Sequence, residues 1–278
     1  MSNQAINHYR EESLPVSAQL PMAGITVRGQ RRSHAARVTP SREAGRLPAP
    51  AEGLRSGLPT SLSHDLRTPL ASILASITSL RIYSQAFDPA TKEHLMSTIQ
   101  DDAERLNRFI ANLLDMTRLD AGAITPRLAP VSLSELVEST VARAGRVLLH
   151  HRVEVRLPAD LPPVDLDFLL AEQALFNLLD NAGKYSAVGA RIEVLAHRLG
   201  EQIEIVVRDE GPGIAPEALD RLFEKFYRAD DGDRRRAGTG LGLAIAKGFV
   251  EVQGGIVAAR NRDDRNGAEF IVTYPVST

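Results

Sequence analysis

Apolar residues recur at helical spacing in two consecutive stretches of the chain. The first stretch has the four-three spacing of a coiled-coil seam, at Leu66, Leu70, Ile73, Ile77 and Leu80. The second stretch, from about residue 90 to 119, repeats this pattern, and Phe87, Asp88 and Pro89 break the chain between the two. We therefore predict a hairpin of two helices, each with one long apolar seam.

The predicted hairpin has little else against which its seams can be buried. The economical arrangement is a homodimer in which two hairpins form a four-helix bundle over residues 56–122. The alternative is a monomer whose hairpin packs on the C-terminal part of the chain. We favour the dimer.

After Gly122 the pattern changes from long helices to a mixture of helices and strands. We predict strands at 152–157, 191–196 and 202–209, a closing hairpin of 255–261 with 269–274, and helices at 167–181 and 241–252. Residues 131–134 predict a short strand that leads into a capped helix ending near Val147. Strands with helices on one face predict an α/β sandwich over residues 123–278.

A histidine with polar neighbours lies at the start of the first predicted helix. His64 precedes the seam residue Leu66 by two positions, so its ring is expected to point away from the seam, and Thr68 shares its face. A lone histidine in a helix is usually a solvated or core residue. Asp65 beside it, and Pro69, which removes a backbone hydrogen bond and bends the helix, favour a reactive residue instead.

Two asparagines lie one helical turn apart about a hundred residues later. Asn177 and Asn181 are expected to share one face of their helix. Amide oxygens and nucleotide phosphates together would suit Mg²⁺, which prefers oxygen ligands. Lys184 can reach phosphate oxygens as a point charge, and Tyr185 can line a nucleotide pocket. An asparagine pair alone is more often a helix cap or simply solvated.

An aspartate at a strand end and a glycine-rich segment complete the candidate nucleotide site. Asp209 precedes Gly211 and Gly213; its carboxylate can accept a hydrogen bond from an adenine amino group, and the glycines permit close backbone approach. Farther on, a glycine-rich loop opens a helix whose N–H groups and dipole favour phosphate, at Gly238, Thr239, Gly240, Leu241 and Gly242.

The segment before this loop is too polar for a core. Residues 229–237 predict a mobile lid over ATP, and Arg228 is a candidate phosphate contact. The three arginines at 234–236 are more typical of a solvated charge run. His150 and His151 precede a strand in a charged stretch, so we interpret them as surface residues rather than metal ligands.

Together these motifs resemble the kinase core of bacterial two-component sensor histidine kinases, over residues 58–275. The boxes of that family occur in order: the H box at His64, the N box at 177–185, G1 at 209–213, the F box at 223–228 and G2 at 238–242. The F box and the Lys184-Tyr185 pair are also similar to kinases of the potassium-sensing KdpD type. Family members often have asparagine where this chain has Glu210, a position that we expect to be tolerant.

The resemblance implies the ATP-binding fold shared by histidine kinases, gyrase and Hsp90 (GHKL), with ATP and Mg²⁺ as cofactors. It makes Asn181 the direct magnesium ligand with Asn177 beside it, and it adds Phe226 to the nucleotide site. His64 would accept the γ-phosphoryl group as a neutral imidazole, a form available because its unperturbed pKa is about 6.5. Asp65 would act as general base.

The same resemblance implies that the phosphoryl group passes to an aspartate of a response regulator. The His-Asp-x-x-Thr arrangement also resembles a phosphatase motif in which Thr68 positions a water. Two other interpretations remain: a phosphatase or scaffold without kinase output, and a chaperone- or topoisomerase-like ATPase. The handedness of the hairpin at residues 84–90, which decides between transfer within and between protomers, does not follow from periodicity.

Composition narrows the classes of protein to which the chain could belong. The 278 residues have a net charge of −2, which gives no case for nucleic-acid binding. The chain has no cysteine, which fits a reducing cytoplasm. No apolar run approaches the ~18 residues of a membrane span, and no signal peptide is apparent. Residues 1–55 are basic and predict a disordered tail or the remnant of an input domain; contact with anionic lipid or an acidic partner is the alternative.

Overall fold

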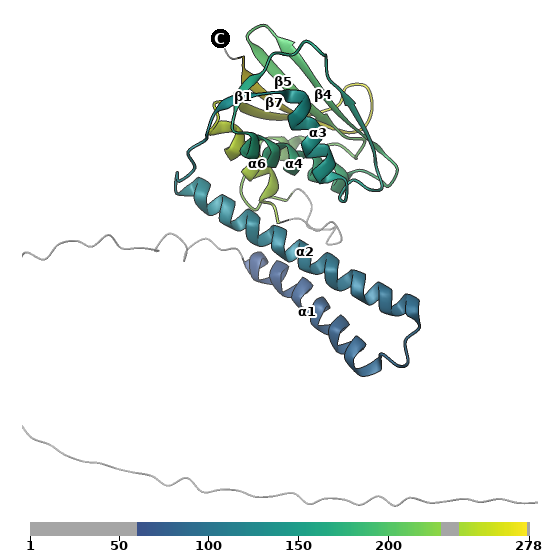
Figure 1. The fold of residues 1–278 in the computed structure, drawn as a ribbon. Helices are drawn as coiled ribbons and strands as arrows, with labels where there is room; N and C mark the ends of the chain where they lie inside the picture. Colours follow the sequence, from purple (N-terminus) through teal and green to yellow (C-terminus); the bar gives the residue numbers. More distant parts are fainter. Residues whose placement is uncertain (1–59, 229–238, 277–278) are drawn as a thin grey trace, which may run out of the picture. The chain divides into compact units, whose positions relative to one another are not determined.

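The computed structural model describes residues 60–228 and 239–276, with side chains from Leu66 onward. The predictions for residues 1–55, for the lid at 229–237, for Gly238 and for the side chains of His64 and Asp65 lie outside this described part. The described residues begin with two long helices and continue into a mixed α/β region (Figure 1).

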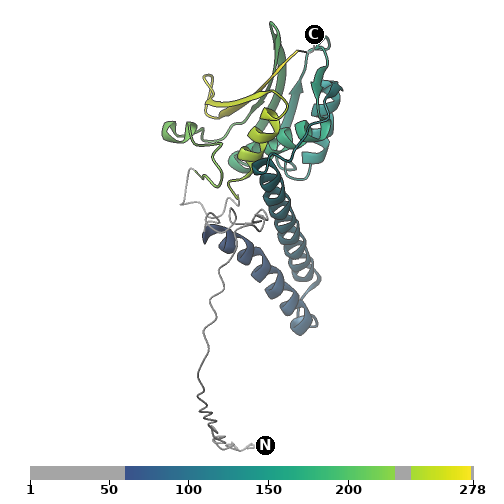
Figure 2. The same cartoon turned by 90° about the vertical axis from the view of Figure 1, so that its left-hand side faces the viewer.

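The first two helices form the predicted hairpin. They are α1 (Thr60–Tyr83) and α2 (Pro89–Asp120), joined at one end by a short loop (Figures 1 and 2). Asp88 caps α2 by accepting a hydrogen bond of 2.6 Å from the backbone N–H of Thr91, and Pro89 occupies the first turn, where no N–H is needed. Phe87, Asp88 and Pro89 thus end one helix region and start the next, as predicted.

In the single chain, the seam predicted on the first helix is divided between two faces. Pro69 and Ser76 are buried, and Ile73 and Leu80 are half-buried, at the four-three spacing of a single face. The predicted seam residues Leu70 and Ile77 are instead 49% and 46% exposed. The apolar residues of α1 therefore form two stripes, because one neighbouring helix can cover only one side of it.

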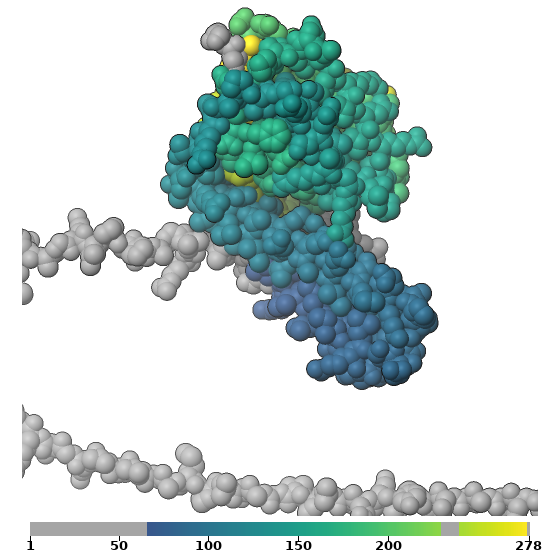
Figure 3. All heavy atoms as spheres, viewed as in Figure 1, coloured from purple at the N-terminus to yellow at the C-terminus, as the bar shows by residue number. Residues whose placement is uncertain are grey.

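Large apolar residues are also exposed on α2. We call the exposed apolar residues of the two helices the outer apolar face of the hairpin: Leu70, Leu74, Ile77, Ile110 and Leu114. Figure 3 shows the hairpin helices, in blue, with one side uncovered along their length. No helix in the part of the chain that is described combines the length and the apolar character that crossing a bilayer requires.

The mixed region is built on a five-stranded sheet in the order β2-β4-β5-β7-β6. Its strands are β2 (Arg152–Arg156), β4 (Arg191–Leu199), β5 (Gln202–Arg208), β6 (Ile256–Asn261) and β7 (Ala268–Pro275). Only the β2–β4 pair is parallel among these; the other three pairs are antiparallel. A separate ribbon pairs β1 (Ala129–Val131) with β3 (Val164–Leu166).

Three helices cover one face of this sheet (Figure 1). Helix α4 (Phe168–Tyr185) packs between α3 (Leu133–Ala144) and α6 (Gly242–Glu251), and a short α5 (Pro216–Leu219) follows the G1 segment. Alternate strand residues supply the core below the helices: Ile192, Val194, Ile203, Ile205, Val207, Phe270 and Val272. The predicted α/β sandwich is confirmed.

The opposite face of the sheet carries a row of alternating charges. Glu193, Arg208, Glu269 and Arg260 lie side by side on four neighbouring strands. The carboxylate of Glu269 pairs with the Nε atoms of Arg208 and Arg260, each at 2.7 Å. Such cross-strand pairs of opposite charge help to set the register of the strands.

Several predicted boundaries differ from those observed. Helix α4 and strand β4 extend to Tyr185 and Leu199, beyond the predicted ends, and the three-residue β3 and four-residue α5 were not predicted. The interpretation of His151 as a surface residue is wrong. Both of its ring nitrogens are buried without a hydrogen-bond partner, because the loop packs on α4 at Gly183. His150 is exposed as expected.

Candidate functional site

The two asparagines of the N box lie on α4, in the middle of the helix layer. Asp167 caps this helix by accepting hydrogen bonds from the N–H groups of Leu169 and Leu170. Asn177 is 5% exposed and Asn181 is half-buried. The amide Nδ2 of Asn177 is buried and has no hydrogen-bond partner. A buried amide with an unpartnered atom is costly, which indicates that a ligand or water completes it.

The last turn of α4 holds the other two N-box candidates. The ammonium of Lys184 forms an ion pair with Asp180, one turn earlier. Tyr185 is 38% exposed, next to the G1 segment. Lys184 is therefore held at the surface of the helix end. A phosphate group would have to compete with Asp180 for its ammonium group.

Asp209 lies directly after β5 and is almost completely buried, at 2% exposure. Its Oδ1 accepts hydrogen bonds from the N–H groups of Gly211 and Ala268, at 2.8 and 3.1 Å. Burial raises the pKa of this carboxyl, and those two hydrogen bonds and the charge of Arg262 act in the opposite direction. Oδ1 is thus committed to the backbone, and Oδ2 accepts none of the hydrogen bonds seen among the described residues.

Close backbone contacts bring the N box and G1 together. A Cβ on Gly211 would lie 2.8 Å from the carbonyl oxygen of Tyr185, so only glycine fits there without a shift. Gly213 has a φ of +83°, and the side-chain amide of Asn261 exchanges two hydrogen bonds with the backbone of the next residue, Ile214. These contacts fix the G1 loop between α4 and β6.

The F box and G2 are joined in the same way. Gly240 has a φ of +68°, and a Cβ there would lie 2.6 Å from the backbone of Phe226. The N–H of Phe226 donates a 2.9 Å hydrogen bond to the carbonyl of Gly240, and Phe226 itself has a φ of +63°. For a bulky residue this conformation is strained, and such strain is typical of functional segments.

The N-terminus of α6 follows G2 directly. Its cap position is Leu241, which makes no side-chain capping hydrogen bond, while the hydroxyl of Thr239 accepts a 3.3 Å bond from the N–H of Leu241. Leu241 is buried, and Gly242 begins the helix. Uncapped N–H groups and the helix dipole make this end suitable for an anion.

Sequence reasoning missed two residues that hold these loops. Asn261, at the end of β6, showed no motif that would have identified it. Glu210 was expected to be tolerant, but its carboxylate accepts hydrogen bonds from the N–H and guanidinium of Arg191 and from Arg265, at 2.9–3.2 Å. The Arg191 N–H is the main cause that lowers the pKa of Glu210.

The H box belongs to the hairpin. Helix α1 contains His64, Asp65 and Thr68. Thr68 is exposed, as its predicted position off the seam requires. The backbone helix continues through Pro69, which lies on the buried side against α2.

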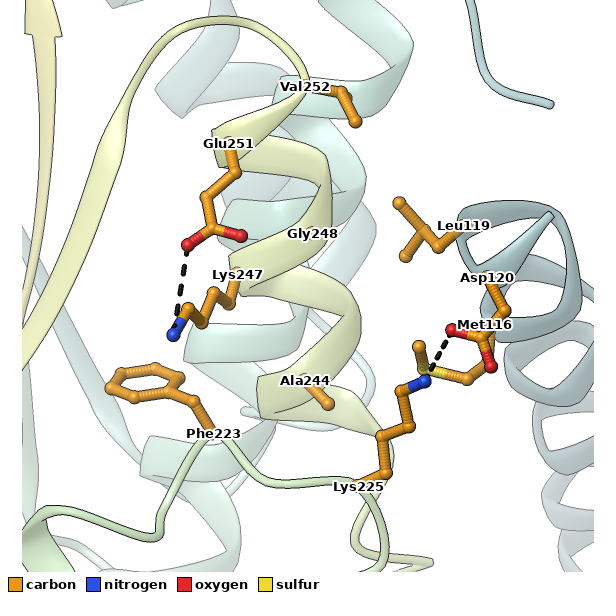
Figure 4. Close-up of a pocket in the computed structure, with 10 residues that line it drawn as sticks. All are labelled: Met116, Leu119, Asp120, Phe223, Lys225, Ala244, Lys247, Gly248, Glu251 and Val252. Atoms are coloured by element: carbon orange, nitrogen blue, oxygen red, sulfur yellow. Dashed lines mark hydrogen bonds and ion pairs between the residues drawn. The ribbon is translucent and has the colours of Figure 1, made fainter. Parts of the chain in front are cut away.

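A groove of about 430 Å³ lies beside the candidate nucleotide residues rather than among them. Figure 4 shows its walls, formed by the end of α2, the F box and α6. Leu119 lies over Gly248, where a Cβ would come within 2.6 Å of its side chain, and Lys225 forms an ion pair with Asp120. The last turn of α2 therefore contacts the helix whose N-terminus follows G2.

Among the described residues, no three histidine, aspartate or glutamate side chains lie together as a metal-binding cluster. A magnesium ion at this site would depend on asparagine oxygens and on a ligand that brings its own oxygens. The unpartnered atom of Asn177 is the donor Nδ2, which suits an acceptor such as a phosphate oxygen, so it is the amide oxygens of the two asparagines that could ligate the metal.

Two family models match this chain. The His Kinase A (phospho-acceptor) domain matches residues 55–122, and the histidine kinase-, DNA gyrase B- and HSP90-like ATPase matches residues 166–278. The chain belongs to the sensor histidine kinases. The two parts of the predicted fold class, a helical hairpin and a GHKL domain, are therefore confirmed.

Individual relatives agree with this assignment. The sensor protein KdpD of Clostridium acetobutylicum is 36% identical over 235 residues, which are 84% of this chain and 26% of KdpD. The histidine-protein kinase/phosphatase MprB of Mycolicibacterium smegmatis is 36% identical over 71% of this chain and 40% of MprB. This sensor kinase chain thus spans about a quarter of the length of that KdpD.

A solved structure shows the same fold. The histidine kinase ThkA, in complex with the response regulator protein TrrA, aligns with a TM-score of 0.60 and 21% identity, over 78% of this chain and 60% of ThkA. The predicted resemblance to KdpD-type kinases agrees with the identity to KdpD.

Asp209→Asn is expected to separate nucleotide recognition from stability. Because burial raises the pKa of the Asp209 carboxyl above its ordinary value of 3.8, protonation favours the folded state and the charge costs stability at neutral pH. The neutral amide should leave Tm unchanged or raise it by up to about 4 °C, while ATP binding weakens at least about tenfold.

The pH dependence provides a second check on Asp209. In the wild type, ATP affinity measured by titration calorimetry should fall as the pH drops through the raised pKa, at a pH above 3.8. In Asp209→Asn this loss should be absent. A variant that binds ATP as tightly as the wild type would show that Asp209 does not contact the base.

Proposed function

We propose that this chain is an ATP-dependent protein histidine kinase that phosphorylates His64. The observation that carries this proposal is that contacts join the N box to G1, at Tyr185 and Gly211, and the F box to G2, at Phe226 and Gly240, while α4 packs on α6 between the two pairs. A helical hairpin with the H box precedes them. We propose a division into a basic segment at 1–55, a dimerisation and phosphotransfer domain at 56–122 and an ATP-binding domain at 123–278.

In this proposal each part of the cluster contacts a different part of the nucleotide. Asp209 accepts a hydrogen bond from the adenine amino group through Oδ2, because Oδ1 is occupied by the backbone. The N–H groups at the start of α6, after Thr239 and Gly240, bind phosphate oxygens. Tyr185, Phe226 and Arg228 line the remaining sides.

Magnesium would be held by Asn181, with Asn177 beside it. The metal, when bound, offsets negative charge on the phosphates. The buried Nδ2 of Asn177 lacks an acceptor, which supports a place for this amide next to a phosphate oxygen of the nucleotide. Lys184 exchanges its Asp180 partner for a phosphate oxygen.

The transfer step uses His64 and Asp65. A neutral imidazole nitrogen of His64 attacks the γ-phosphorus of ATP, an N–P bond forms, and the bond to the bridging oxygen of ADP breaks. Asp65 takes the proton from the other ring nitrogen, as a general base one position along the helix. The cytoplasm, where ATP is supplied, is the proposed compartment.

The phosphoryl group then passes to an aspartate of a response regulator. Support comes from the two-component family to which the chain belongs and from the solved kinase ThkA, whose structure contains such a regulator. A chaperone- or topoisomerase-like ATPase would have no use for the hairpin with its H box. A scaffold without kinase output would not need an intact nucleotide site.

Incubation with γ-labelled ATP and magnesium tests the phosphoacceptor directly. The wild type should acquire label that is lost in acid and stable in base, and His64→Gln should acquire none. His94→Gln is the matched control, because His94 is an exposed histidine on the other hairpin helix. Label that persists on His64→Gln would contradict the proposal, as would ATP turnover without any label on the wild type.

Phosphatase activity towards the regulator is a second candidate function. The exposed position of Thr68, one turn after His64, favours it, because an exposed hydroxyl can orient water on a docked phosphoaspartate. MprB is also described as a kinase/phosphatase. Thr68→Ala should keep autophosphorylation and lose about tenfold or more of regulator dephosphorylation, measured on purified phospho-regulator. Equal dephosphorylation by both proteins would remove Thr68 from this role.

We also propose that the outer apolar face of the hairpin is the dimer interface. Leu70, Leu74, Ile77, Ile110 and Leu114 are large apolar side chains on the two hairpin helices, and each of them is 46–58% exposed. Closing it against a second hairpin completes a four-helix bundle.

Ile77→Glu should dissociate this dimer, since it places a charge in the centre of the bundle. Light scattering should then show a mass near the single-chain value of 30.2 kDa instead of twice that value. Leu199→Glu is the control, because Leu199 is similarly exposed but lies at the end of β4. A dimeric Ile77→Glu protein would place the interface elsewhere.

A further inference from the structure

A buried arginine lies behind the proposed adenine-binding carboxylate. Arg262 directly follows β6, and its side chain is 2% exposed. Arginine is rarely buried to this extent unless it is fully paired, because removing its charge from water is costly. No motif of the sequence pointed to this residue, and the proposed reaction does not use it.

Every part of the Arg262 guanidinium has a partner. Nε and Nη2 form a bidentate pair with the carboxylate of Asp264, at 2.9 and 3.0 Å. Nη2 also lies 3.1 Å from Glu193, which is itself 4% exposed on β4. Nη1 donates a 3.3 Å hydrogen bond to the backbone carbonyl of Asp209. A planar guanidinium can hold three groups in one fixed arrangement, which a lysine cannot.

The segment after Arg262 meets the backbone of Asp209 from another side. The N–H of Arg262 bonds to the carbonyl of Gly267 at 3.0 Å, closing this turn. A Cβ on Gly267 would lie 2.1 Å from the carbonyl oxygen of Asp209 and 2.8 Å from Cδ of Arg262. Ala268 then exchanges backbone and carboxylate hydrogen bonds with Asp209. Arg262, Gly267 and Ala268 are therefore packed against Asp209 as one unit.

We propose that Arg262 is a positioning residue for adenine recognition: it fixes the backbone of Asp209 so that Oδ2 points at the base. This inference rests on the proposed role of Asp209. Arg262 does not touch the nucleotide; it acts through the Asp209 carbonyl that it binds. Its charge also lies close to the carboxyl, and it opposes the effect of burial on the pKa of Asp209.

A specificity measurement separates positioning from a merely structural ion pair. Adenine presents an amino donor at the position where guanine presents a carbonyl acceptor, so a correctly placed carboxylate favours ATP over GTP. Loss of global stability weakens the binding of both nucleotides alike. Displacement of Asp209 lowers the preference for ATP specifically.

The test compares Arg262→Met with Arg260→Met in the full chain. Both arginines pair with a buried acid that keeps a second arginine after the substitution: Glu193 keeps Arg156, and Glu269 keeps Arg208. Arg260 is 59% exposed and donates to Glu269, not to Asp209. Arg262→Lys keeps the charge and loses the bidentate geometry.

ATP and GTP affinities are measured in magnesium by competition with a fluorescent ATP analogue, and Tm is recorded for each variant. Arg262→Met should lose about tenfold or more of the ATP-over-GTP preference, Arg262→Lys should lose part of it, and Arg260→Met should keep it. If the methionine variant does not fold, the lysine variant decides the question. An unchanged preference in a folded Arg262 variant overturns the proposal. A wild type without any preference overturns the adenine role of Asp209 itself.

Discussion

The packing of α4 against α6 on one face of the sheet determines where every candidate nucleotide residue lies. The two helices come from segments about sixty residues apart, and the core residues between them and the strands are almost completely buried, as for Leu178, Leu179 and Ile245. The end of α4 is thereby brought to the end of β5, and the start of α6 to the F box. Burial of apolar surface is the dominant favourable contribution to the folding free energy. The candidate nucleotide site lies at the edge of the buried core.

At this edge, backbone contacts replace side-chain packing. Gly211, Gly240 and Gly267 each touch a neighbouring backbone so closely that a Cβ would not fit. The loops are therefore positioned by hydrogen bonds and van der Waals contact of the main chain, which leaves side chains such as Asn177 and Asp209 to meet a ligand. Glu210 and Asn261 hold the same loops from outside.

Local pattern was sufficient for the helices, the main strands and the order of the motifs, because periodicity and capping are local properties. It did not give the pairing of distant segments. The second stripe on α1, the buried ring of His151 and the partners of Glu210 and Arg262 all depend on which segments become neighbours in the fold. The short β3 and α5 were missed because three or four residues are too few to show a period. Gly211 and Gly240 were recognised as glycines of a nucleotide site, but the backbone atoms that they approach could not be predicted.

The contact of Leu119 with Gly248 has a consequence for exchanging modules between kinases. Helix α2 ends with a branched side chain that occupies the space left by a missing Cβ on α6 (Figure 4). A chimera that joins this hairpin to another ATP-binding domain will fit at that point only if the new helix has glycine at the equivalent place. Residues 119 and 248 are therefore best transplanted as a pair, together with the Asp120–Lys225 ion pair beside them.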